Sequence, residues 1–538
     1  MNRNDVIDAI GRIDDEMIEQ VDSLRRKEQK TSLSANRLKQ DEKNHQWKRN
    51  KQRMKWAALA ACFCLIIMAA HRITRSALFL SGDGGNGGKD GMTYMSYAGP
   101  VFPLSAADDG TDIFVERNID FDFSPYETVT ETYEFDHETY TDEHSDSKSI
   151  VTDSYTLSNA TGNNQTMTLL YPFSGSLDSE IEQKPAVTVD GMEVAADLFA
   201  GPYAGGFEGA GDGDDSELML NLTEPDSWEA YKALLESDYP ERAFDAFPNL
   251  DQPVVVYELH DLYGAESDDA PAPTISMEFY MDYDKTTILT YGFDGMISDS
   301  ESGYCNRNAF IPYDPANSGS LYMIVLGDDI GTYTVNGYTD GSCEQKMENA
   351  GGKVERYECT LGAILEKTAR QYLSQRDAQN DDTIQSCILS AVPETVWIGL
   401  AAEVLYDYGV LSDTPADRYS DGMLDSIFME TESMKRVMYL RFDVTIPANA
   451  SVDICAKMVK PASQNFICLH EEDANYNGYD MVTQLGSSLS FTNQTASISH
   501  TDYIEILDQN FGFDLENGIT KVKLDIRQEH YFLDVTKI

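Results

Sequence analysis

The stretch IVTDSYTLSNATGNNQTMTLLYPF, residues 150–173, has the pattern of two strands joined by a polar turn. Val151, Tyr155 and Leu157 alternate with polar residues before the turn, as in a strand with one buried face. Further along, AVTVDGMEV (186–194) places an Asp-Gly pair between two short alternating runs, and this pair predicts a two-residue hairpin. This region is therefore expected to be β-structure.

Strand patterns continue through most of the chain beyond this region. The run TISMEFYM (274–281), followed by TTILTYGF (286–293), predicts a hairpin that turns between Asp282 and Lys285. The further predicted strands are VVVYEL (254–259), RVMYLRFDVTI (436–446), SVDICAKMV (451–459), TKVKLDI (520–526) and HYFLDV (530–535).

Helical periodicity interrupts these strand patterns at residues 226–237, 361–373 and 394–408. Asp226 is well placed as the N-cap of the first of these helices. Long runs of strands with a helical interlude predict a mainly β fold with helical insertions (α+β). The expected units are antiparallel and sandwich-like, in contrast to a doubly wound parallel sheet.

The run WAALAACFCLIIMAA (56–70) carries no charge and no proline. It covers about 22 Å as a helix, and ITRSALFL (73–80) extends it toward the roughly 30 Å of a bilayer core. Residues 1–75 hold 16 Lys/Arg against 10 Asp/Glu, whereas the rest of the chain holds 24 against 82. Because basic residues mark the cytoplasmic side, we expect a single-pass protein of the cell membrane with a cytoplasmic N-terminus and an extracellular C-terminal domain.

Three other interpretations of residues 56–70 stay open. A cleaved signal peptide would have a charged region of 55 residues, far beyond the usual size. A buried core helix fits the short run but does not explain the basic cluster before it. Lipidation fits the lipobox-like Leu59-Ala60-Ala61-Cys62, although more apolar residues follow the cysteine.

The cytoplasmic piece is expected to hold one amphipathic helix between residues 4 and 27. Its apolar residues recur at spacings of three and four, and the other positions are largely acidic. Such a stripe needs a partner helix, which is either its own copy in a short coiled coil or another protein. The docking residues are Val6, Ile10, Ile13, Met17, Val21 and Leu24.

Composition divides the chain into six consecutive parts. Residues 81–91 are rich in glycine, which is typical of a flexible linker. The expected parts are 1–55 (cytoplasmic helix and a basic stretch beside the lipid bilayer), 56–80 (transmembrane helix), 81–95 (linker), 96–345 (β-rich ectodomain), 346–415 (mainly helical) and 416–538 (C-terminal β-rich part).

The formal net charge of −52 predicts an acidic and well solvated surface. Nucleic acid is excluded as a partner, because phosphate contacts need lysine and arginine. The charge favours cations or basic partners and does not identify the extracellular ligand.

Six cysteines lie beyond the membrane segment, and an even number outside the cell permits three disulfides in 15 pairings. The alternative is that they are scattered, buried small hydrophobes. The disulfide candidates are Cys305, Cys343, Cys359, Cys387, Cys455 and Cys468, of which the last two are placed to bridge neighbouring strands.

One string resembles a calcium loop. Asp473, Asn475, Asn477 and Tyr479 follow the D-x-N-x-N-G spacing, in which oxygen ligands at alternate positions converge on Ca²⁺. Position twelve is Gln484, not a bidentate Glu, so an ordinary turn rich in Asn and Gly explains the string as well. Calcium is the one cofactor that the sequence suggests.

Catalytic motifs are missing from the sequence. No G-x-S-x-G and no H-E-x-x-H occurs, and no catalytic residue is assigned. The abundant carboxylates leave room for a hydrolase with a pair of acids, so a non-enzyme is the expectation and a carboxylate hydrolase an alternative.

The N-terminal IDAIGRIDDEMIEQ (7–20) and KWAALAACFCLIIMAA (55–70) resemble the start of uncharacterised single-pass membrane proteins of Clostridia-like bacteria. Some of those have an architecture like that of anti-sigma factors, although the zinc-binding H-x₃-C-x₂-C of the common anti-sigma domain is absent here. Similar outer segments are YAGPVFPL (97–104), DSYTLSN (153–159), LLYPFSGSL (169–177), GYDMVTQLG (478–486) and QNFGFDLENGIT (509–520).

These observations predict a surface protein whose acidic extracytoplasmic domain binds or senses a ligand. The resemblance implies that its cytoplasmic helix docks a partner such as a sigma factor. The first alternative is a passive adhesive or structural surface module, in which the N-terminal piece only anchors the chain. The second is the extracellular carboxylate hydrolase.

Overall fold

The computed structural model describes the backbone of residues 93–107, 113–135, 138–144, 146–202, 206–208, 221–223, 228–264, 272–299, 301–311, 319–379, 386–407, 411, 422–467 and 477–538. The expected transmembrane segment and the docking residues Val6 to Leu24 lie outside these ranges, as does the expected N-cap Asp226. Among the described helices, none is both long and apolar enough to cross a bilayer.

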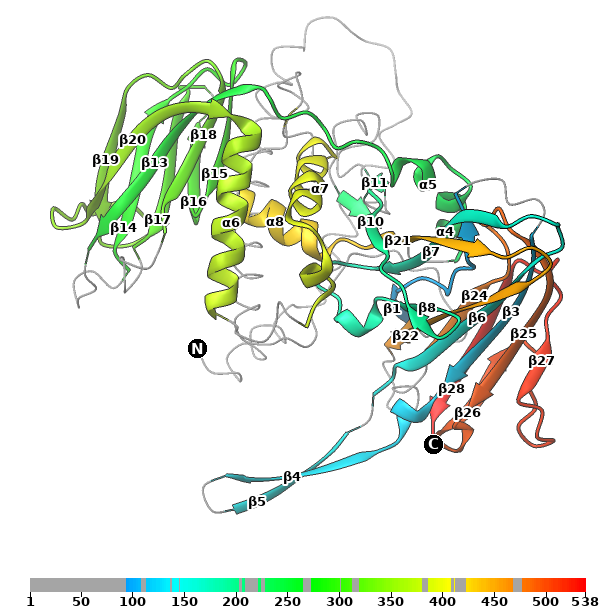
Figure 1. The fold of residues 1–538 in the computed structure, drawn as a ribbon. Coiled ribbons are helices and arrows are strands. Elements are labelled where there is room, and N and C mark those ends of the chain that lie inside the picture. The colour runs from blue at the N-terminus through cyan, green and yellow to red at the C-terminus, as the bar shows by residue number, and fades with distance from the viewer. Residues whose placement is uncertain are drawn as a thin grey trace, which may run out of the picture. The chain divides into compact units, whose positions relative to one another are not determined.

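The described part is mainly β, with several antiparallel sheets, as the sequence predicts (Figure 1). A large sandwich contains a seven-stranded and a four-stranded sheet that share one apolar core. The seven-stranded sheet has the order β27 (Lys521–Lys523), β25 (Ser490–Ser499), β3 (Ile113–Asp122), β6 (Ser149–Asn159), β22 (Ser451–Lys460), β8 (Ala186–Val189), β9 (Met192–Glu193). The four-stranded sheet has the order β10 (Asp197–Ala200), β21 (Arg436–Ile446), β7 (Gln165–Gly175), β2 (Ser105–Ala106).

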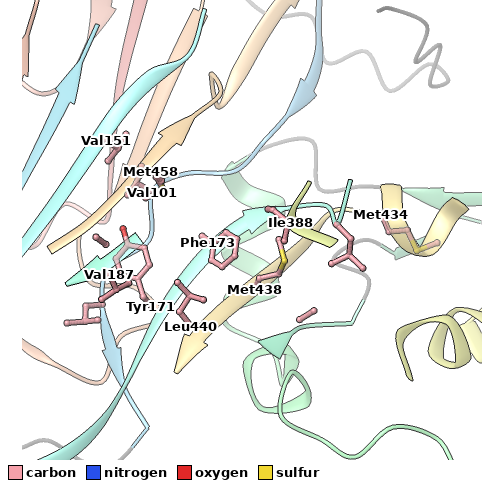
Figure 2. Packing of buried hydrophobic residues seen from close by; sticks show 14 of the residues in the cluster. Val101, Val151, Tyr171, Phe173, Val187, Ile388, Met434, Met438, Leu440 and Met458 are labelled. Atoms are coloured by element: carbon pink, nitrogen blue, oxygen red, sulfur yellow. The ribbon is translucent and has the colours of Figure 1, made fainter. Parts of the chain in front are cut away.

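Strict alternation along the strands builds this core. In β6 every second residue is buried, from Ser149 to Asn159, and β3 has the same pattern. Figure 2 shows the layer between the sheets, where Tyr171 and Leu440 of the four-stranded sheet lie near Val187 of β8. The period-2 pattern of residues 150–157 is therefore confirmed as a half-buried strand.

A five-stranded sheet contains the first and the last described strands. Its order is β1 (Thr93–Tyr97), β23 (Gln464–Ile467), β24 (Asn477–Val482), β28 (His530–Lys537), β26 (Ile504–Gln509). β1 is thus an edge strand of this sheet, and among the described strands it pairs with β23.

A small sandwich is formed by residues 253–360. One sheet has the order β15 (Thr286–Tyr291), β18 (Leu321–Gly327), β13 (Pro253–Tyr263), β20 (Gly351–Thr360). The other has the order β16 (Gly295–Asp299), β17 (Tyr304–Phe310), β14 (Thr274–Tyr280), β19 (Tyr333–Tyr338). Alternate residues such as Met277, Leu259 and Met323 fill the space between them.

The helices follow or precede this sandwich. They are α4 (Trp228–Leu235), α5 (Tyr239–Arg242), α6 (Leu361–Gln379), α7 (Glu394–Asp407) and α8 (Leu424–Ser433). The three helices predicted from periodicity correspond to α4, α6 and α7. α6 is tied to the first sheet of the small sandwich by the Lys367 ammonium, 2.8 Å from Glu258. Tyr291 of β15 likewise donates to Gln375 of α6 at 2.9 Å.

Two short hairpins complete the described elements: β4 (Val129–Phe135) with β5 (Glu138–His144), and β11 (Gly206–Glu208) with β12 (Asn221–Thr223). Short 3₁₀ turns include η3 (Ile181–Gln183) and η6 (Ile388–Ala391).

The Asp190-Gly191 hairpin is confirmed. Val189 of β8 pairs with Met192 of β9, and the two turn residues have φ values of 50° and 76°. Both values are positive, as a type I′ turn requires.

The predicted hairpin at Asp282 to Lys285 is wrong. The chain does turn there, and the Lys285 amide donates to the Asp282 carbonyl at 3.0 Å. However, β14 pairs with β17 and β19, whereas β15 pairs with β18. The turn leads from one sheet of the small sandwich to the other. In this arrangement β14 and β15 bury their apolar side chains in the same core from opposite sides.

The strand pairings join two sequence ranges, 96–345 and 416–538, that were expected to be separate parts. β7 pairs with β21 over eleven residues, and β6 pairs with β22, so residues from 96–345 and 416–538 form one sandwich. Asn159 joins the two corners where these strands change sheets: its amide donates to the carbonyls of Asn163 and Ile446 at 2.8 and 3.1 Å. One ladder, β3 with β25, is parallel.

Candidate functional site

The structure divides the calcium-like string. Asp473 and Asn475 lie outside the described residues, whereas Asn477 and Tyr479 belong to β24, which pairs along its length with β28. The Tyr479 phenol is buried and lies 2.8 Å from the Tyr126 hydroxyl. Within the described ranges, no three His, Cys, Asp or Glu side chains are grouped so that they could hold a metal ion. Calcium binding at this string stays a prediction.

The described cysteines form no disulfide with one another. Cys305 and Cys387 are buried, which is the behaviour of small hydrophobes. Cys468 lies outside the described residues, so its pairing with Cys455 stays a prediction. The five described cysteines are Cys305, Cys343, Cys359, Cys387 and Cys455.

Asp480, the residue after Tyr479, lies at the centre of a buried group of ionisable side chains. Its Oδ2 accepts a 2.5 Å hydrogen bond from the Tyr97 hydroxyl and lies 3.2 Å from His530 Nε2. Its Oδ1 is buried and has no hydrogen-bond partner among the described residues. We call Tyr97, Lys460, Asp480 and His530 the Asp480 cluster.

Three separate strands bring the cluster together with β24. Tyr97 ends β1, Lys460 ends β22, and His530 begins β28. The Trp228 ring stacks on the His530 imidazole with centroids 4.6 Å apart and planes 5° apart, so α4 closes this side of the cluster. Such packing restricts the imidazole to one orientation beside the carboxylate.

Burial changes the acid–base behaviour of the cluster. It raises the pKa of the Tyr97 phenol well above its ordinary value, and the nearby Asp480 carboxylate acts in the same direction. It lowers the pKa of the Lys460 ammonium to about 7, although Asp480 opposes this shift. A buried lysine that exchanges its proton near neutral pH makes the net charge of the cluster sensitive to its surroundings.

The cluster holds the segment that follows β1. The Ala98 carbonyl accepts hydrogen bonds from Ser174 Oγ at 2.5 Å and from Lys460 Nζ at 3.4 Å. The Ala98 amide donates to the Ser463 carbonyl at 2.7 Å, and the Ser463 hydroxyl in turn accepts from the Asp480 amide. The first described strand is therefore held by side chains from three other parts of the fold.

A second buried network lies inside the large sandwich. Asp153 of β6 pairs with Arg117 of β3 and also accepts hydrogen bonds from the hydroxyls of Tyr155 and Tyr171, at 2.6 and 3.1 Å. Arg117 donates to the carbonyl of Val482, the last residue of β24, at 2.6 Å. This network occupies the space between the two sheets, where the alternating pattern alone predicts apolar residues.

Sequence reasoning missed both networks. The sequence pattern assigned no role to Asp480, and Lys460 lies one residue beyond the predicted strand 451–459. One signal was present: Arg117 and Lys460 occupy alternate positions that are otherwise apolar, and Asp153 lies between Val151 and Tyr155 on the buried face of its strand.

No protein-family model matches the chain, and no match is found among curated proteins.

Proposed function

We propose that this protein is a non-enzymatic, single-pass surface protein with a cytoplasmic N-terminus. Its acidic β-rich domain binds or senses a ligand outside the cell, and the stripe from Val6 to Leu24 docks a protein such as a sigma factor inside. The charge reversal on the two sides of residues 56–70 supports this direction of insertion.

The observation that carries the sensing role is the position of the Asp480 cluster. Any signal from the outer fold to the membrane segment passes through residues 71–92 and enters β1. β1 lies at the edge of its sheet, and its last residue, Tyr97, is fastened by Asp480. In this proposal β1 switches between a paired and a released state, and the ionisable side chains of the Asp480 cluster set the balance between the two.

The orientation is tested on intact cells that express the full chain. Protease added outside should digest the region beyond residue 80 and leave the N-terminal piece protected. Digestion of the N-terminal piece, with protection of the region beyond residue 80, would reverse the proposed orientation.

The docking role is tested with a photo-crosslinking residue placed at Ile13, on the apolar stripe, or at Asp15, on the acidic face. We expect a specific crosslinked protein from position 13 and none from position 15. If position 13 captures only another copy of the chain, the sensor proposal fails and the passive adhesive module is the better description.

A further inference from the structure

A cleft of about 340 Å³ lies at the edge of the large sandwich. It is lined by residues of η3, of β8 and the segment before it, and of β9 and the segment after it. One residue each from β21 and β22 completes the lining. The chain leaves β9 here and crosses to β10 in the other sheet, so the cleft lies where the two sheets are joined. Its volume falls within the roughly 300–1,000 Å³ of small-ligand sites.

The floor of this cleft is apolar. Val187 and Leu440 are 4% and 1% exposed, and Figure 2 shows them in the same layer between the sheets. Val194 packs against this core, and its amide donates to the Val187 carbonyl at 3.1 Å. The floor therefore belongs to the apolar core of the sandwich.

Two cations and two anions lie around the floor: Lys184, Lys457, Glu182 and Glu193. None of the four forms an ion pair or a side-chain hydrogen bond with another described residue. Some other lysines of this acidic chain are paired: Lys148 lies 2.7 Å from Glu180, and Lys353 lies 2.7 Å from Asp261. The cleft thus combines an apolar floor with unpaired charges of both signs.

This combination selects the chemistry of the ligand. A phosphate or another anion would face the two carboxylates in a chain of net charge −52, and a simple cation would face the two lysines. A molecule that carries both a carboxylate and an ammonium group satisfies both pairs, and an apolar side chain on the same molecule covers Val187 and Leu440.

We propose that this cleft binds an apolar zwitterion of the amino-acid and short-peptide class. Lys184 and Lys457 contact the carboxylate of the ligand, and Glu182 and Glu193 contact its ammonium group. This inference is independent of the Asp480 cluster, because the two sites share no residue.

The test is isothermal titration of the full chain in detergent with L-leucine and with the dipeptide Leu-Leu. The two probes distinguish a free amino acid from a peptide. We expect saturable binding of at least one probe. The double change Lys184→Ala with Lys457→Ala should weaken it by about tenfold or more, which corresponds to the loss of one charged hydrogen bond.

Matched controls separate the site from the general charge of the protein. Lys521→Ala with Lys523→Ala removes two lysines of β27, outside the cleft, and should leave binding unchanged. N-acetylated Leu-Leu lacks the ammonium group and should bind the natural chain more weakly. In the Glu182→Gln and Glu193→Gln double variant, acetylation should make little further difference, because the partner carboxylates are already gone.

Three results would overturn the proposal. The first is the lack of saturation with either probe up to its solubility. The second is an affinity for N-acetylated, C-amidated Leu-Leu equal to that for the free dipeptide. The third is an equal loss of binding in the two lysine double variants.

Discussion

Arg117 on β3 and Asp153 on β6 form a double contact, in which Nε to Oδ1 and Nη2 to Oδ2 are both 2.8 Å. Both side chains are fully buried. The pairing is diagonal, because Arg117 lies opposite Tyr155 and Asp153 lies opposite Ile119. Asp153 thus accepts four hydrogen bonds, two from Arg117 and one each from the hydroxyls of Tyr155 and Tyr171.

The change Arg117→Leu should destabilise the fold by about 3–5 kcal/mol, because it leaves the Asp153 carboxylate buried without its counter-ion. Denaturant unfolding followed by fluorescence measures this loss. The control is Arg356→Leu, which removes an exposed contact with Asp329 and should change stability little. An equal loss of unfolding free energy in the two variants would contradict the prediction that the buried Arg117 pair matters more because it is buried.

The stability of the fold should rise with pH above 7 because of Lys460. The folded chain releases the Lys460 proton at about pH 7, whereas the unfolded chain keeps it up to about pH 10.4. Between these pH values the unfolded state binds one more proton. The free energy of unfolding therefore increases with pH, by up to about 1.4 kcal/mol per unit from this group.

Lys460→Met should remove that part of the pH dependence. It should also stabilise the fold at pH 7 and below, because the folded chain then no longer buries a charged ammonium group. Lys457→Met, on the exposed face of the same strand, is the matched control and should keep the slope. Unfolding measured from pH 6 to 9.5 distinguishes the two variants, and parallel curves would contradict the prediction.

Two glycines with positive φ should respond differently to alanine. Gly191 has φ +76° and open space around a Cβ, so Gly191→Ala should cost about 1–2 kcal/mol from backbone strain alone. Gly327 has φ +88°, and a Cβ there would meet the Lys285 carbonyl oxygen at 1.9 Å. Gly327→Ala should therefore be clearly more destabilising, as a comparison of thermal midpoints would show. A larger loss at Gly191 would contradict the described geometry of both turns.

The five described cysteines should react with iodoacetamide in the order of their exposure. Cys343, Cys359 and Cys455 are partly exposed and should be labelled in the native protein. Cys305 and Cys387 are buried and should be labelled only after denaturation. Peptide mapping without reductant gives the result. A disulfide between any two of the five would contradict it.

The elements that could be predicted from the sequence are those encoded locally. Alternation identified β6 and β22, helical period identified α6 and α7, and an Asp-Gly pair identified the hairpin after β8. Pairing partners could not be predicted in the same way. The strand Thr286–Tyr291 can bury its apolar side chains either in a hairpin with β14 or in the opposite sheet. Only contacts with residues distant in sequence decide between these two arrangements.

The candidate site was hidden for the same reason. Tyr97, Lys460, Asp480 and His530 are spread over more than 430 positions of the chain and form no local motif. Their meeting depends on the order of strands in two sheets. The cleft residues Lys184 and Lys457 likewise come from distant segments, and their lack of ion-pair partners is a property of the fold, not of any spacing.

The order of pairing has a consequence for biogenesis. Residues 176–435 must be synthesised before β21 can pair with β7, which at roughly 5–20 residues per second leaves the early strands waiting for about 10–50 s. The wait is longer still for β1, because its partner β23 begins only at Gln464. A polypeptide that stops before Gln464 would lack β23, the described pairing partner of β1, and would therefore emerge with β1 unpaired.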